Sequence, residues 1–178
     1  MKFVQEHLPT KSGFNKLSST SALSDANWVL VFGSVNRFSE RNFASQLQKR
    51  YHNAQIIGCT TPGEITGGGV FDDSVHITAM QWQRSQLRFI CKPVNSMEQS
   101  HALGAQIANE LIAPDLKGVF VLSDGLNVNG SELVEGLQEV LPNTPITGGL
   151  AGDDAKFTKT LLLNNDQIKD RIVIAVGI

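Results

Sequence analysis

The chain has 178 residues, of which 41% are hydrophobic and 18% charged, and its formal net charge is −2 at pH 7. This size and composition predict one folded domain, while a near-neutral charge without a basic cluster argues against a nucleic-acid surface. We also expect a cytoplasmic protein, because no apolar segment is long enough to cross a membrane and the sequence MKFVQEHLPTKSGF lacks the apolar core of a secretory signal.

Residues 1–25 are expected to form an N-terminal arm or linker. They contain Pro9, Gly13 and a serine and threonine run at 18–21, a composition that cannot build a core by itself. The folded domain is therefore predicted over residues 26–178.

A first βαβ unit is predicted directly after the arm. The short apolar run 28–32 indicates a buried strand. Ser39 is placed to cap a helix whose buried stripe is Phe43, Leu47 and Tyr51. Residues 54–58 then predict a second strand, parallel to the first because a helix connects them. The turn-rich segment CTTPGEITGGG follows at residues 59–69.

A hairpin and a linking helix come next. Residues 75–82 and 87–94 alternate apolar with polar side chains, which favours two antiparallel strands joined by a turn. Ser96 and Gln99 have the spacing of a capping box, which predicts a helix that ends before Pro114.

The second βαβ unit has the clearest signals. Residues 119–122 predict a buried strand, Asn129 is a helix cap, and Pro142 ends the helix. Residues 145–147 begin a parallel strand that leads into the glycine-rich loop GGLAGDD.

The two βαβ units match one another when the chain is shifted by 90 residues, so that Trp28 falls on Gly118. The apolar register agrees through strand, helix and strand, which predicts an internal duplication with repeats over about 26–94 and 116–178. A chance match between two ordinary βαβ units is the alternative. A further hairpin, 158–163 with 171–177, completes an α/β fold of mixed sheet or sheets.

Three motifs resemble one family. GCTTPGEI, VLSDGLNVNGSELVEGL and PITGGLAGDD are similar to the FIST N-terminal domain, a bacterial sensory module, and the resemblance covers residues 26–178. It implies a small-ligand sensor of signal transduction, with amino acids as the usual ligand class and a histidine kinase, cyclase or chemoreceptor as the signalling partner. FIST proteins usually continue into a C-terminal FIST domain, and this chain stops within an apolar strand, so we expect a fragment of a longer protein.

Ligands of open α/β sheets bind outside the carboxyl ends of parallel strands. Glycine lets backbone amides approach a ligand carboxylate, and nearby acids suit an ammonium group, so a zwitterion such as an amino acid fits these loops. The alternative is that the glycines and acids only form turns and caps. The candidate ligand-binding residues are Ser34, Asn36, Arg37, Cys59, Thr60, Thr61, Glu64, Asp124, Asn127, Gly149, Leu150, Ala151, Gly152 and Asp153.

Enzymatic and metal-binding interpretations are weaker. Cys59 begins a polar loop, but the sequence places neither a histidine nor a helix N-terminus beside it to activate the thiol. Glu64, Asp153 and Asp154 could bind a metal, yet they lack a ligand-spacing motif. We therefore expect a binding protein that is not an enzyme and holds neither metal nor cofactor, with catalysis by Cys59 or the acids as an alternative.

A haem sensor is the other alternative. Some FIST proteins bind haem and report nitric oxide, so the resemblance makes an axial histidine a possibility to weigh. The four histidines, which are scattered along the chain, are His7, His52, His76 and His101.

Overall fold

The computed structural model describes residues 1–9 and 23–178, so the serine-rich part of the predicted arm lies outside the described residues. The chain divides into two compact units, each assembled from two separate segments. Unit 1 comprises Met1–Arg84 and Gly152–Lys169, and unit 2 comprises Ser85–Ala151 and Asp170–Ile178. No helix in residues 1–9 or 23–178 has the length and apolar character that a membrane crossing requires.

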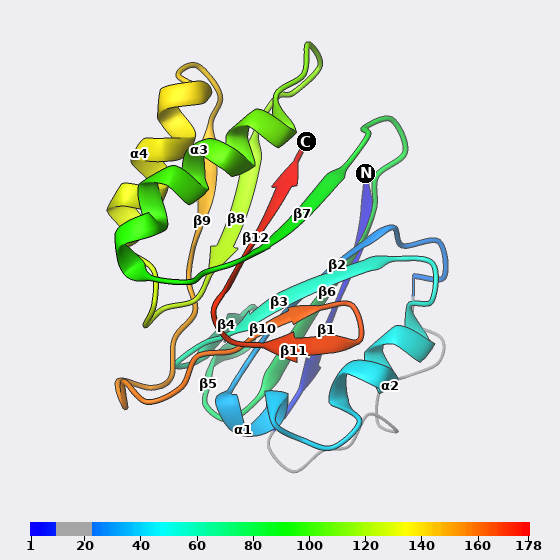
Figure 1. The fold of residues 1–178 in the computed structure, drawn as a ribbon. Coiled ribbons are helices and arrows are strands. Elements are labelled where there is room, and N and C mark those ends of the chain that lie inside the picture. Colours follow the sequence, from blue (N-terminus) through cyan, green and yellow to red (C-terminus); the bar gives the residue numbers. More distant parts are fainter. Residues whose placement is uncertain (10–22) are drawn as a thin grey trace. The chain divides into compact units, whose positions relative to one another are not determined.

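Unit 1 is built on a six-stranded mixed sheet with the strand order β1-β6-β2-β3-β10-β11 (Figure 1). Within it β2 and β3 run parallel, and the other neighbours are antiparallel. The carboxyl ends of β2 and β3 therefore lie at the same edge of the sheet. A separate two-stranded ribbon is formed by β4 and β5. The strands of unit 1 are β1 (Lys2–Leu8), β2 (Trp28–Gly33), β3 (Gln55–Thr60), β4 (Glu64–Thr66), β5 (Gly69–Phe71), β6 (Val75–Gln81), β10 (Leu162–Asn164) and β11 (Gln167–Lys169).

Two helices, α1 (Val35–Phe38) and α2 (Phe43–Arg50), pack on one face of this sheet. Alternate residues of β2, Val29 and Val31, join the same buried cluster as Leu47 of α2. Full burial of one such side chain stabilises the fold by about 1.5–3 kcal/mol.

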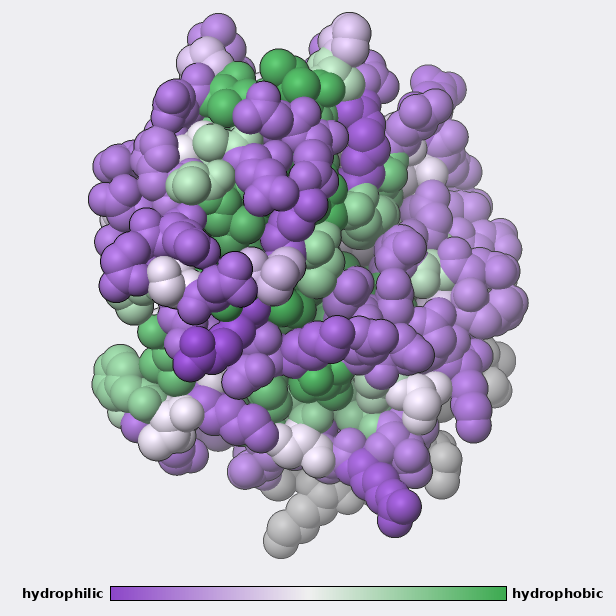
Figure 2. All heavy atoms as spheres, in the orientation of Figure 1, coloured by the Kyte–Doolittle hydropathy of each residue, from purple (hydrophilic) through white to green (hydrophobic). Residues whose placement is uncertain are grey.

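On the molecular face seen in Figure 2, hydrophilic residues predominate and hydrophobic residues form small separate patches.

Strand β1 lies in the segment that the sequence analysis assigned to an arm, and a buried polar contact fixes it to α2. Glu6 of β1 accepts hydrogen bonds from the hydroxyl of Tyr51 at 2.5 Å and from Nε of Arg50 at 3.2 Å. Burial, followed by the bond to Glu6, raises the pKa of Tyr51, so the phenol stays protonated and keeps donating.

Unit 2 has a four-stranded mixed sheet with the order β7-β12-β8-β9, in which β8 and β9 are parallel. Its strands are β7 (Arg88–Pro93), β8 (Val119–Ser123), β9 (Ile146–Leu150) and β12 (Ile172–Gly177). The helices α3 (Ser100–Leu111) and α4 (Gly130–Val140) pack side by side, and the 3-10 helix η2 (Met97–Gln99) precedes α3 (Figure 1).

Glycine sets the close approach of α3 and α4. A Cβ atom at Gly136 would lie 2.0 Å from the carbonyl oxygen of His101, and one at Gly104 would lie 2.2 Å from that of Leu133. Both distances are far below van der Waals contact, so these two positions exclude any side chain. Asn129 caps α4 as expected, since its side chain accepts a hydrogen bond from the amide of Glu132 at 3.3 Å.

The predicted α/β fold of mixed sheets is confirmed, but both long hairpins were wrong. β6 pairs with β1 and β2 in unit 1, whereas β7 pairs with β12 in unit 2. β12 lies between β7 and β8, and the hairpin found within residues 158–177 is the short pair of β10 and β11. Alternation identifies a strand, but the partner of that strand depends on contacts far away in the sequence.

Two predicted caps were also wrong. Ser39 does not begin α2, because Ser34 caps the short helix α1 and α2 starts only at Phe43. Ser96 makes no capping hydrogen bond, since η2 intervenes before α3.

The two units share a strand arrangement. Both contain two antiparallel steps followed by one parallel pair, β1-β6-β2-β3 in unit 1 and β7-β12-β8-β9 in unit 2. This likeness agrees with the duplication hypothesis, which stays a hypothesis. The two βαβ units belong to two different sheets.

Candidate functional site

The fourteen candidate residues separate into two groups, one in each unit. The unit 2 group is Asp124, Asn127, Gly149, Leu150 and Ala151. The unit 1 group is Ser34, Asn36, Arg37, Cys59, Thr60, Thr61, Glu64, Gly152 and Asp153. Residues of each group line a hollow within their own unit.

The unit 1 pocket lies where β2 and β3 end and has a volume of about 110 Å³. Four of its lining residues were predicted, and Asp72, Asp73 and Lys156 are among those that the sequence analysis missed. Asp72 and Asp73 lie in the loop before β6. The sequence FDD shortly before an apolar strand could have indicated these two residues as candidates. The pocket is lined by Ser34, Val35, Asn36, Thr61, Pro62, Asp72, Asp73, Asp153, Asp154 and Lys156.

Charge is the main property of this pocket, which combines four carboxylates with one ammonium group. Asp73 accepts hydrogen bonds from Oγ of Ser34 at 2.7 Å and from Nδ2 of Asn36 at 3.2 Å, which holds the α1 segment against the β5–β6 turn. Lys156 Nζ lies 3.5 Å from Oδ2 of Asp154, and both side chains are largely exposed. The pocket can therefore offer both signs of charge to a small molecule.

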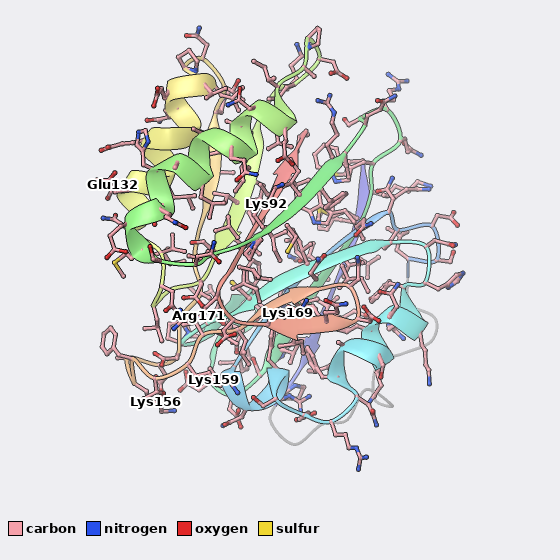
Figure 3. The ribbon with its side chains drawn as sticks, in the orientation of Figure 1. Lys92, Glu132, Lys156, Lys159, Lys169 and Arg171 are labelled. Carbon is pink, nitrogen blue, oxygen red and sulfur yellow. The ribbon has the colours of Figure 1, made fainter. Side chains whose placement is uncertain are left out.

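Asp153 holds the loop that carries Lys156. Its carboxylate accepts hydrogen bonds from the backbone amides of Phe157 at 3.0 Å, Thr158 at 2.6 Å and Lys159 at 3.0 Å. These amides, with Lys159 first, hold the pKa of Asp153 below its ordinary value, so the carboxylate stays charged. Figure 3 shows Lys156 and Lys159 on this same loop.

Several predicted residues of unit 1 are buried and used by the fold. Glu64 accepts hydrogen bonds from Oγ1 of Thr61 at 2.7 Å and from Oγ of Ser74 at 2.5 Å. Thr60 accepts from the amide of Leu161 at 3.1 Å, and the buried Arg37 pairs with Glu40.

In unit 2, Asp124 organises the loop after β8. It is fully buried and accepts hydrogen bonds from the amides of Leu126 at 2.8 Å, Asn127 at 2.7 Å and Arg171 at 2.9 Å, and from Nδ2 of Asn127 at 3.0 Å. Burial alone would raise the pKa of Asp124, but these bonds outweigh it and hold the pKa below its ordinary value.

The second hollow is a groove of about 390 Å³ between β9 and α4, which we call the β9 groove. Gly149 and Leu150, expected in a loop, lie within strand β9 and line this groove, whereas Ala151 is buried beyond its end. The groove is lined by Val121, Ser123, Gly130, Leu133, Val134, Ile146, Thr147, Gly148, Gly149 and Leu150.

The histidines lie in three different settings. His7 and His76 are opposite one another on β1 and β6, and the ring of His7 lies 4.3 Å from that of Phe71. Burial first, and then the charge of His7, lowers the pKa of His76. His101 Nε2 lies 3.4 Å from Oε2 of Glu139, and His52 is exposed. Within residues 1–9 and 23–178, no group of three or more His, Cys, Asp or Glu residues could hold a metal ion.

Cys59 lies within β3 and is buried, and this burial raises its pKa to about 12. A thiol with that pKa is almost entirely protonated near pH 8 and is a poor nucleophile. Cys91 is exposed.

We expect the native chain to react with one equivalent of a thiol reagent at pH 8, and the Cys91→Ser variant to react only after unfolding in urea. Rapid labelling of native Cys91→Ser would show that Cys59 is reactive and would revive the catalytic alternative.

In the comparison with known proteins, one family matches the chain. The sequence model of the FIST N domain matches residues 27–178. A search of curated protein sequences found no match.

Proposed function

The chain belongs to the FIST N domain family of sensory domains in signal transduction, and we propose that it binds a small amino acid or a similar small polar metabolite without converting it. The unit 1 pocket is the proposed site. The observation that carries this choice is the convergence of four carboxylates and one lysine at the carboxyl ends of the two parallel strands β2 and β3.

The chemistry of the pocket suits a zwitterion. An α-ammonium group would sit among the carboxylates of Asp72, Asp73 and Asp154, and an α-carboxylate would reach the ammonium group of Lys156. The volume of about 110 Å³ is smaller than that of a typical cofactor pocket, which favours an amino acid with a short side chain.

The proposal is one of binding alone, with no resident cofactor. The protonated, buried thiol of Cys59 supports the absence of a nucleophile, and the carboxylates of Glu64 and Asp153 are committed to hydrogen bonds within their own loops. A sensor must bind its ligand more tightly in one conformation than in another. The signalling partner that would respond is a histidine kinase, a cyclase or a chemoreceptor.

The test uses the full chain and a panel of the twenty amino acids in a thermal-shift assay, followed by calorimetric titration of those that raise the melting temperature. We expect short-chain amino acids to bind. Lys156→Met is expected to weaken this binding at least tenfold, because the partner of the ligand carboxylate is lost. The methyl ester of the same amino acid, which lacks that carboxylate, is expected to bind the wild type and Lys156→Met equally.

Lys159→Met is the matched control, since this exposed lysine lies on the same loop but does not line the pocket, and its backbone bond to Asp153 is retained. It is expected to bind like the wild type. Equal weakening by both lysine variants, or no amino acid that raises the melting temperature, would contradict the proposal. Proton NMR of the bound amino acid after a day should show an unchanged compound, and a new product would contradict its non-enzymatic part.

A further inference from the structure

Two histidines lie opposite one another at the β1 edge of the unit 1 sheet. His7 of β1 and His76 of β6 are direct partners in the antiparallel pair, so both imidazole rings project from the same face of the sheet. Directly opposite residues of such a pair have Cβ atoms about 4.5–5.5 Å apart, and like charges at these positions destabilise the pairing. The charge state of the two rings therefore affects how firmly β1 is held.

The paired strands are poorly suited to hold both rings in the protonated form. Nε2 of His7 and Nδ1 of His76 are buried and have no hydrogen-bond partner among residues 1–9 and 23–178. A protonated imidazole carries a proton on both of its nitrogens, so each of these buried atoms would become a charged donor without an acceptor. A donor that loses its hydration without gaining an acceptor is unfavourable.

The groups around the two rings do not compensate for this loss. The ring of His7 lies 4.3 Å from that of Phe71 on β5, and Phe32 of β2 lies opposite His76 on the other side of β6. The charges that act on His76 are those of His7 and of Glu64 on β4. Glu64 favours the protonated ring, but burial and then the charge of His7 outweigh it and lower the pKa of His76.

Strand β1 can separate from β6 without opening the rest of the sheet. In the described part of the chain, β1 has one sheet neighbour, and it pairs with that strand over Lys2–Leu8. On the face opposite to His7, Glu6 accepts a hydrogen bond from the hydroxyl of Tyr51 at 2.5 Å and Leu8 is buried in the core. Separation of β1 would leave the pairing of β6 with β2 unchanged.

From this arrangement we propose that His7 and His76 form a pH-dependent switch that controls the pairing of β1 with β6. Near pH 7.5 the two rings are uncharged and the strands stay paired. Below about pH 6 both rings take up protons, like charges face one another across the pair, and β1 separates from β6. This switch needs no amino acid in the unit 1 pocket, so its test is independent of that for the proposed function.

The direction of the pH dependence follows from His76. Its pKa is lower while the strands are paired than in the unfolded chain, where it is about 6.5. The paired state therefore binds fewer protons at mildly acidic pH than the state in which β1 is released. Pairing is fully stable above about pH 6.5 and weakens as the pH falls below that value.

Hydrogen exchange of the full chain, corrected for the intrinsic pH dependence of amide exchange, measures the pairing of β1. Between about pH 7.5 and pH 5, we expect the protection of the β1 amides bonded to β6 to fall at least tenfold. The amides of β8 and β12 in unit 2 should keep their protection within about twofold. Unchanged protection of β1, or an equal loss in both units, would overturn the inference.

Three glutamine variants identify the group that responds to pH. His76→Gln removes the ring with the lowered pKa and is expected to give β1 the same protection at both pH values. His7→Gln removes the opposing charge and should reduce the loss. His52→Gln is the matched control, because His52 is exposed in the same unit and lies outside both strands, and it should keep the full loss. A full loss that persists in His76→Gln would assign the effect to another group, such as Glu6, and overturn the inference.

A second measurement does not depend on how well the variants fold. Proton NMR of the wild-type chain follows the ring signals of its four histidines during a pH titration. We expect His76 to take up its proton below about pH 6.5, and the β1 amide signals to change over the same pH range. Protonation of His76 without any change in the β1 signals would show that the strand does not respond, which would overturn the inference.

Discussion

Gly148→Ala is expected to lower the free energy of unfolding by about 3 kcal/mol, because the new methyl group has no place to go. A Cβ at this position would lie 1.7 Å from the carbonyl oxygen of Val121, and φ is +146°, a conformation that residues with a side chain rarely adopt. The carbonyl oxygen of Val121 belongs to the backbone of β8, which is paired with β9, so relief requires β9 to move away from β8. Urea denaturation followed by circular dichroism measures the change.

The neighbouring position provides the control for this prediction. Gly149 is exposed in the same strand, and its Cβ would meet no atom within 4 Å. Gly149→Ala is therefore expected to change the free energy of unfolding by no more than about 0.5 kcal/mol. If the two alanine variants were equally stable, the close contact between β8 and β9 at Gly148 would be wrong.

Asp124→Ala is the second substitution with a large expected effect, about 3 kcal/mol of destabilisation. The substitution removes the acceptor of four hydrogen bonds and leaves the backbone amides of Leu126, Asn127 and Arg171, which are only partly shielded from water, without it. Since one of these bonds joins the loop after β8 to the start of β12, the sheet of unit 2 should loosen there. Hydrogen exchange of the β12 amides would measure this loosening.

The effect of Asp124→Ala should depend on pH in a defined direction. The pKa of Asp124 is lower in the folded chain than in the unfolded chain, where it is about 3.9. Its contribution is therefore fully present above the unfolded pKa and is lost as the pH falls through the folded one. The stability difference between the wild type and Asp124→Ala should be constant near neutral pH and shrink below about pH 4.

Two further variants separate charge from position. Asp124→Asn keeps one acceptor oxygen and is expected to destabilise less than Asp124→Ala. Asp170→Ala removes an exposed acid of the same unit and is expected to cost no more than about 0.5 kcal/mol. A pH-independent difference for Asp124→Ala, or equal losses at Asp124 and Asp170, would contradict the role of this carboxylate.

Part of the site could be predicted because its positions depend on local geometry. Ser34 and Thr61 directly follow β2 and β3, and parallel strands bring their carboxyl ends together, so both residues reach the unit 1 pocket. Asp73 and Lys156 were missed because each comes from a loop whose place depends on pairing elsewhere in the chain. Glu64 was expected to face a ligand, yet its carboxylate is buried against Ser74.

The sequence by itself determined the strands of the βαβ units, the helix α4 and the family. Hydrophobic periodicity and the cap at Asn129 are local signals, and they identified β2, β8 and α4 from residues within a few turns of one another. Only the tertiary structure decided that β6 and β7 belong to different sheets and that β12 returns to lie between β7 and β8. The physical reason is that a strand pattern records which side of a strand is buried, whereas its hydrogen-bond partner is selected by distant segments that complete the same core.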